Sequence, residues 1–155
     1  MGIFYRIDKP TGIVVFQNDG PIEFSDWERT VLAAMKDPAF KGSRRRFLSD
    51  RRNLTQPHSL ALIESIQGFI RAQSNRIGEG QWAVVGRPGS TQEAIDLAEA
   101  LLVSSRIRVK SFTDLKPALA WLLPISDELE LQRLHWWVDQ REGPETKTAT
   151  PEGRR

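Results

Sequence analysis

The order of strand-like and helix-like segments predicts an α/β fold, with a mixed and mostly parallel central sheet of about five strands and helices on its faces. Two observations support this prediction. Short apolar stretches alternate with longer amphipathic stretches through residues 1–124. In addition, residues 82–85 (Trp-Ala-Val-Val) are apolar without alternation, which is typical of a strand that is covered on both faces in the middle of a sheet.

The N-terminal part of the chain predicts a β-hairpin and a helix. Residues 3–7 and 13–16 are apolar and flank a turn that contains proline and glycine, as in two paired strands. Residues 25–28 (Ser-Asp-Trp-Glu) have the spacing of a capping box, in which two side chains bind the amide groups at a helix start. We expect this helix to end before Pro38, because proline disfavours the helical conformation in the preceding residue.

The rest of the predicted domain repeats strand and helix in turn. In chain order we expect a strand around 47–48, a helix over 62–77, a strand at 81–86, a helix opened by a second capping box at 90–93, a strand at 107–112 and a short helix that starts at 113–114. Pro124 is expected to close this domain, which therefore comprises residues 1–124.

Two further segments follow the predicted domain. Residues 125–141 predict an amphipathic accessory helix, because acidic residues occupy its first turns and apolar residues recur along one side. Residues 142–155 contain no large apolar residue, so their composition predicts a disordered tail.

Composition narrows the class of protein. The chain has 155 residues, 39% of them hydrophobic and 27% charged, which suits one globular domain. No apolar run approaches the roughly 20 residues of a membrane-spanning helix, and no secretory signal pattern is present, so we expect no membrane span and a cytoplasmic location. The absence of cysteine excludes disulfides and thiolate catalysis.

A basic patch lies between Arg44 and Arg52. Residues 41–52 hold six basic side chains against the single acid Asp50, while the formal charge of the whole chain is only +2. Such a patch attracts phosphates or an acidic protein surface, but a solvated loop beside a strand also explains it. We do not expect nucleic acid as a partner, because the patch lacks the interleaved aromatic residues that single-strand binders use.

Four segments carry a family resemblance, and they read Phe4-Tyr5-Arg6-Ile7, Asp37-Pro38-Ala39-Phe40, Leu48-Ser49-Asp50-Arg51 and Val109-Lys110-Ser111-Phe112-Thr113-Asp114, the last continuing to Ala118-Leu119-Ala120-Trp121-Leu122. With these segments in this order, the chain over residues 3–123 resembles the STAS superfamily, in particular its SpoIIAA-like members. The resemblance implies an α/β module that acts through protein contacts.

The resemblance also implies a regulatory serine. In anti-sigma-factor antagonists of that superfamily, a serine at the start of the helix after the third strand is phosphorylated, and the added charge switches partner binding. Ser59 is the nearest candidate for phosphorylation here, although the sequence lacks the Asp-Ser pair and glycine expected at that place. The alternative is that Ser59 is an ordinary polar residue at a helix start.

No side-chain pattern predicts catalytic, metal or cofactor chemistry. His58 and His135 lie far apart in the sequence and lack a carboxylate at metal-ligand spacing. Asp50, His58 and Ser59 occur on one segment without a nucleophile elbow. We therefore expect a non-enzymatic protein without a cofactor, and an enzyme that uses Asp50, His58 and Arg87 is the less favoured alternative.

Residues at strand ends are the candidates for ligand binding, since α/β sheets usually bind ligands there. They are His58, Ser59, Arg87 and Ser90. Arg87 and Ser90 belong to the loop at 86–90, whose glycines allow close approach and whose following helix offers amide groups to an anion. That loop matches no phosphate-binding fingerprint, and a turn that leads into a capped helix also explains it.

The adjacent residues Trp136 and Trp137 are the candidate interface. Two neighbouring side chains on a helix point about 100° apart, so one surface rarely covers both. Either the helix packs back across the domain, or it docks onto a protein partner or a second copy. The sequence thus predicts a binding or regulatory module that acts through protein contacts, and the alternative is an apolar or anionic small molecule, a lipid included, bound at the strand ends.

Overall fold

The computed structural model describes residues 2–40, 45–54, 59–87, 106–140 and 146–148. Within them, five strands form one sheet, in the spatial order β1 (Ile3–Ile7), β2 (Val14–Asn18), β3 (Arg45–Asp50), β4 (Gly80–Val85) and β5 (Ile107–Phe112). The β1–β2 pair is antiparallel and the other three pairs are parallel. The mixed, mostly parallel sheet of the predicted α/β fold is confirmed.

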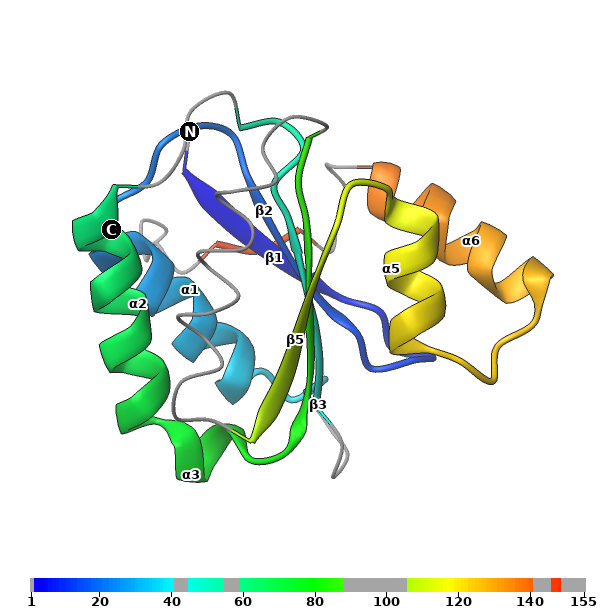
Figure 1. The fold of residues 1–155 in the computed structure, drawn as a ribbon. Coiled ribbons are helices and arrows are strands. Elements are labelled where there is room, and N and C mark those ends of the chain that lie inside the picture. The colour runs from blue at the N-terminus through cyan, green and yellow to red at the C-terminus, as the bar shows by residue number, and fades with distance from the viewer. Residues whose placement is uncertain (1, 41–44, 55–58, 88–105, 141–145, 149–155) are drawn as a thin grey trace.

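Helices cover both faces of this sheet (Figure 1). On one face lie α1 (Phe24–Lys36), α2 (Leu60–Ala72) and the short α3 (Ser74–Ile77). On the other face lie α5 (Leu115–Leu122) and α6 (Glu128–Asp139). The helix predicted to open at 90–93 is outside the described residues. Throughout the described ranges, no helix is long and apolar enough to cross a membrane.

Aromatic rings dominate the core on the α1 side of the sheet. Phe47 of β3 and Trp82 of β4 are register partners, and their ring centroids lie 4.5 Å apart. Phe16 of β2 stacks on both rings, and Trp27 of α1 stacks on the Trp82 ring from the helix side. Because β-strand side chains alternate between faces, these rings form one continuous layer across three strands.

The opposite core is aliphatic. Val15, Leu48 and Ala83 form a row across β2, β3 and β4 that points to the second face. Against this row pack the buried stripe of α5 and the inner side of α6, which contribute Leu115, Ala118, Leu119, Leu122, Leu134 and Val138. The last helix therefore packs back onto the sheet beside α5.

Two helix boundaries differ from the sequence prediction. The capping box at 25–28 is wrong, because α1 begins at Phe24 with Glu23 in the N-cap position. Phe24 stacks on Trp27 one turn later, and this apolar contact favours an earlier start. The helix predicted over 62–77 breaks at Gln73, and the turn there brings Ile77 into the α1-side core, fully buried.

The described part of the C-terminal tail, residues 146–148, bonds to the edge of the sheet. Within the stretch for which composition predicts disorder, Lys147 forms an antiparallel bridge with Tyr5 of β1. The described residues of this tail are 146–148, so its remainder lies outside the described residues.

A glycine pair provides a test of the strand register. An added Cβ at Gly80 would overlap the carbonyl oxygen of Arg45, its partner on β3, whereas a Cβ at Gly68 in α2 meets open space. We expect Gly80→Ala to lower the free energy of unfolding by about 1–3 kcal/mol through overpacking. Gly68→Ala should raise it by about 0.5–1 kcal/mol, because alanine favours helix. Urea denaturation measures both, and a stable Gly80→Ala variant would contradict the register.

Candidate functional site

Buried polar side chains gather at the carboxyl ends of β2 and β3. Gln17 is the register partner of Asp50, and Asp50 is 0% exposed. Arg6 of β1 is buried beside them. Ligands of α/β proteins usually bind at this edge of a parallel sheet, so these groups are the candidate functional site.

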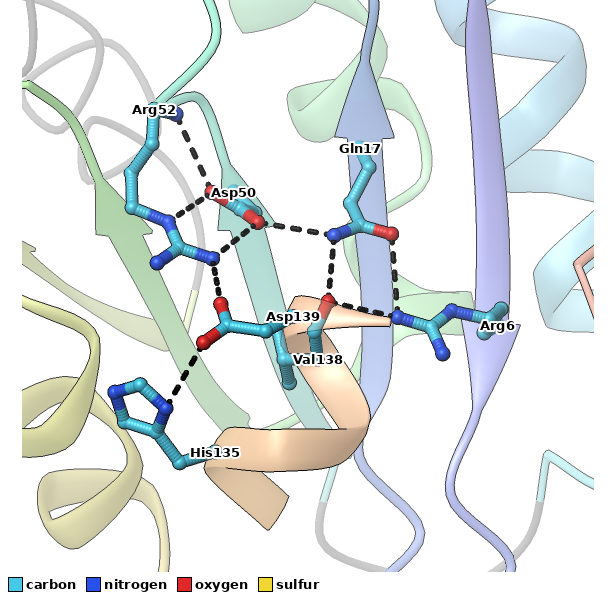
Figure 2. Close-up of polar contacts among 7 residues, drawn as sticks. All are labelled: Arg6, Gln17, Asp50, Arg52, His135, Val138 and Asp139. Carbon is cyan, nitrogen blue, oxygen red and sulfur yellow. Dashed lines mark hydrogen bonds and ion pairs between the residues drawn. The ribbon is translucent and has the colours of Figure 1, made fainter. Parts of the chain in front are cut away.

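Asp50 is the central acceptor of this site (Figure 2). The Arg52 side chain donates from Nε to Oδ1 at 2.8 Å and from Nη2 to Oδ2 at 3.0 Å, a bidentate pair. Gln17 donates from Nε2 to Oδ2 at 3.0 Å, and the Arg52 backbone amide donates to Oδ1. Both carboxylate oxygens therefore have donors from inside the protein.

Arg6 and Gln17 bind the C-terminal end of α6. The backbone carbonyl of Val138 accepts from Arg6 Nη2 at 3.0 Å and from Gln17 Nε2 at 3.1 Å. Carbonyls in the last turn of a helix lack intrahelical donors and carry the negative end of the helix dipole. A guanidinium and an amide from the sheet thus cap this helix.

Side chains of α6 complete the network (Figure 2). Arg52 Nη2 lies 2.9 Å from Asp139 Oδ1, and His135 Nδ1 lies 3.2 Å from Asp139 Oδ2. The Arg6 guanidinium also lies over the ring of Trp137, 4.3 Å from its centroid. We call Arg6, Gln17, Asp50, Arg52 and Asp139, with the Val138 carbonyl, the α6 clamp.

A second ion pair holds the middle of α6 to the N-terminal hairpin. Arg133 donates from Nη1 and Nη2 to the two carboxylate oxygens of Asp8, both at 3.0 Å. Glu130 also binds Arg133, at 2.7 Å. Together with the clamp, this pair fixes which side of α6 faces the sheet.

The electrostatics of Asp50 do not suit acid–base catalysis at neutral pH. Burial by itself raises the pKa of this carboxyl, but the hydrogen bonds and charge of Arg52, with the hydrogen bond from Gln17, outweigh it and lower the pKa below the ordinary value of 3.8. The pKa of the Arg52 guanidinium is raised, chiefly by its hydrogen bond to Asp50. The pair stays ionised and acts as a structural link.

Of the four predicted ligand-binding residues, the structure describes Ser59 and Arg87. Ser59 is the N-cap of α2, and its Oγ accepts from the amide of Leu62 at 3.1 Å. Arg87 is exposed just after β4. His58 and Ser90 lie outside the described residues. Within the described part of the chain, Asp50 binds Arg52 and Gln17.

The two predicted interface tryptophans divide between the two sides of α6. Trp137 packs against the aliphatic core and under Arg6. Trp136 is 63% exposed. Only Trp136 is therefore available on the outer surface.

Comparison with known proteins identifies no relative. No family model, no curated protein and no solved structure matches this chain. In the ranges that the structure describes, no group of three histidine, aspartate or glutamate side chains could hold a metal ion. The interpretation of the site therefore depends on its geometry.

Sequence reasoning missed most of the clamp. Arg6 interrupts the apolar run of β1, Gln17 directly follows the apolar run of β2, and both are buried. A buried polar residue requires a partner, so this interruption of the strands was the available signal. It could not identify Val138 as the acceptor, because that carbonyl is 132 residues from Arg6 and belongs to the backbone.

The clamp predicts a specific acid sensitivity. Because the folded-state pKa of Asp50 is lowered, its contribution to stability is fully present above the ordinary value of 3.8 and is lost as the pH falls through the folded value. Asp50→Asn should lower the free energy of unfolding by about 3 kcal/mol at pH 7 and make stability less dependent on pH in the acid range. Asp139→Asn, at the exposed end of the clamp, should cost under about 1 kcal/mol. Urea midpoints between pH 7 and pH 2.5 measure these effects, and equal costs for both variants would contradict the assignment.

Ser59 offers a simple test of its local role. Ser59→Ala removes the acceptor for the Leu62 amide and should lower the free energy of unfolding by about 1 kcal/mol. Ser59→Asp keeps an acceptor at the helix start and should retain the stability of the unmodified protein. Thermal denaturation distinguishes the two. Unchanged stability of the Ser59→Ala variant would contradict the capping role of Ser59.

Proposed function

We propose that this chain is a non-enzymatic binding module of STAS or SpoIIAA-like type, which captures a protein partner on the outer side of α6. One observation carries the proposal: Leu129 and Trp136 are 76% and 63% exposed, and they lie seven residues apart on the same helix. Seven residues are two helical turns, so both side chains project from one side. We call them the outer pair.

The rest of α6 explains why this side stays outward. Arg133, Leu134 and Val138 bind the hairpin and the core from the inner side. The clamp fixes the last turn, next to Trp136. A rigid helix that presents tryptophan loses little conformational freedom on association, and tryptophan is enriched among residues that dominate binding energy.

Acidic residues define the chemistry of the expected partner. Asp127 and Glu128 are exposed at the start of α6, where Glu128 pairs with Lys116, and the exposed Asp139 at its end pairs with Arg52. These carboxylates keep one face toward solvent, where a second cation can approach. Protein interfaces combine an apolar centre with a polar rim. The partner that fits is therefore a protein surface with an apolar pocket for Trp136 and basic residues around it.

The start of α2 is the proposed regulatory position. Ser59 is exposed at the helix N-terminus and Leu60, beside it, is 71% exposed. A phosphate at a helix N-terminus is favoured by the helix dipole and the amide groups there. This exposure supports the implied role of Ser59 as a modified serine that alters partner contacts.

Small-molecule binding at the strand ends has less support. Among the described residues there, Gln17, Asp50 and Arg52 are bonded to one another and to α6. A ligand would have to replace these bonds, and each replaced bond inside a protein costs free energy.

A paired set of variants tests the proposal. The double variant Leu129→Ala with Trp136→Ala should lose capture of the partner that the unmodified chain retains, with a fall of about 30-fold or more in affinity, as for a residue that dominates an interface. Glu64→Ala, at an exposed position in the middle of α2, is the control and should keep the partner. Affinity capture followed by titration of the captured protein measures the difference, and light scattering tests a second copy as the partner. Equal retention by the double variant would overturn the proposal.

A further inference from the structure

The open edge of β1 carries a second recognition feature, on a different surface from the outer pair. β1 is the first strand of the sheet, so one side of its backbone faces away from β2. Edge strands present backbone donors and acceptors that pair readily with another extended segment. In this chain the edge is already used by a short piece of the tail.

Lys147 occupies the edge through its backbone. The Tyr5 amide donates to the Lys147 carbonyl at 2.8 Å, and the Lys147 amide donates to the Tyr5 carbonyl at 2.9 Å. The backbone N–H and C=O groups of successive residues point to opposite sides of an antiparallel strand. Those of Ile3 and Ile7 therefore face the same edge as those of Tyr5. A longer segment could therefore pair with three residues of β1.

Asp37 and Tyr5 form a side-chain subsite beside this bridge. The Lys147 ammonium lies 2.7 Å from Asp37 Oδ2, which also accepts from the Tyr5 hydroxyl at 2.8 Å. The Ala39 amide donates to Asp37 Oδ1 at 2.9 Å. Two groups of the domain thus hold the carboxylate in place independently of Lys147.

The subsite selects a cation. The Asp37 side chain is only 5% exposed, and the Lys147 side chain is 50% exposed. Burial by itself raises the pKa of Asp37, but the hydrogen bonds from Lys147, Ala39 and Tyr5 outweigh it and lower the pKa. A fixed, ionised carboxylate at a strand edge favours lysine or arginine on an incoming strand.

We propose that the edge of β1, with Asp37 and Tyr5, is a strand-addition site for an extended lysine-bearing peptide, and that residues 146–148 are its resident occupant. A partner segment with the same chemistry, a lysine between small polar residues such as threonine, takes the place of the tail. Main-chain pairing supplies affinity at such sites, and side-chain pockets supply the choice of sequence.

The resident segment is suited to be displaced. Its described residues, 146–148, contact β1 at one bridge, and the Lys147 side chain of the ion pair is half exposed. Attachment to the same chain raises its local concentration to about the millimolar range, so the tail competes with any partner. A peptide that pairs with more of β1 than residues 146–148 do can therefore displace them.

Full-length variants with one change in the tail test this proposal. Lys147→Glu places a negative charge against Asp37 and should release the bridge, so that the Tyr5 amide exchanges with solvent at least about 10-fold faster, as expected for an opened edge. Lys147→Arg keeps the cation and should exchange like the unmodified protein. Lys147 is at the surface, so both variants should fold.

A synthetic peptide with the sequence of residues 143–151 then serves as the probe. It should bind Lys147→Glu about 10-fold or more tighter than the unmodified chain, whose tail competes, and should restore protection of the Tyr5 amide. The same peptide with glutamate in place of its lysine should not bind. Unchanged Tyr5 exchange in Lys147→Glu, or peptide binding that ignores the lysine, would overturn the proposal. The Leu129→Ala, Trp136→Ala double variant should bind the peptide normally, which separates this site from the α6 surface.

Discussion

The buried carboxylate of Asp50 is the interaction on which the arrangement of the molecule depends. A fully buried charge is tolerated only with close partners, and Arg52 and Gln17 supply them. Gln17 in turn binds the Val138 carbonyl and thereby joins the sheet to the last turn of α6. One carboxylate thus links two parallel strands to the last turn of a helix that is distant in the chain, since Gln17 and Val138 are 121 residues apart.

The first strand has three roles, and each uses a different part of it. The side chain of Arg6 reaches the α6 face and caps that helix. The side chain of Tyr5 points to the other face and positions Asp37. Its backbone edge meets Lys147. The two proposed recognition surfaces, the outer pair and the β1 edge, are therefore both connected to β1 and remain separate from each other.

Periodic patterns predicted the strands and most helices, because the apolar side chains of strands and helices repeat with fixed spacing. They failed where one particular contact decides the local outcome, whether that contact is near or distant in the sequence. The α1 start moved to Phe24 because its ring stacks on Trp27. Sequence patterns predicted neither the hydrogen bond from Arg6 to the Val138 carbonyl nor the bridge from Lys147 to Tyr5. Both contacts depend on the order of the strands in the folded sheet. The tryptophan pair signalled a two-sided helix, but only packing shows that Trp137 faces inward and Trp136 outward.

Native-state amide hydrogen exchange of α6 tests the central claim most directly, because it reports the free energy at which each segment opens. If the clamp joins α6 to the sheet, the amides of Leu134 and Val138 will open with the same free energy as those of β3, in one cooperative unit. If α6 exchanges at much lower free energy while β3 stays protected, the helix is only loosely attached, and the account of the clamp and of the outer pair is contradicted.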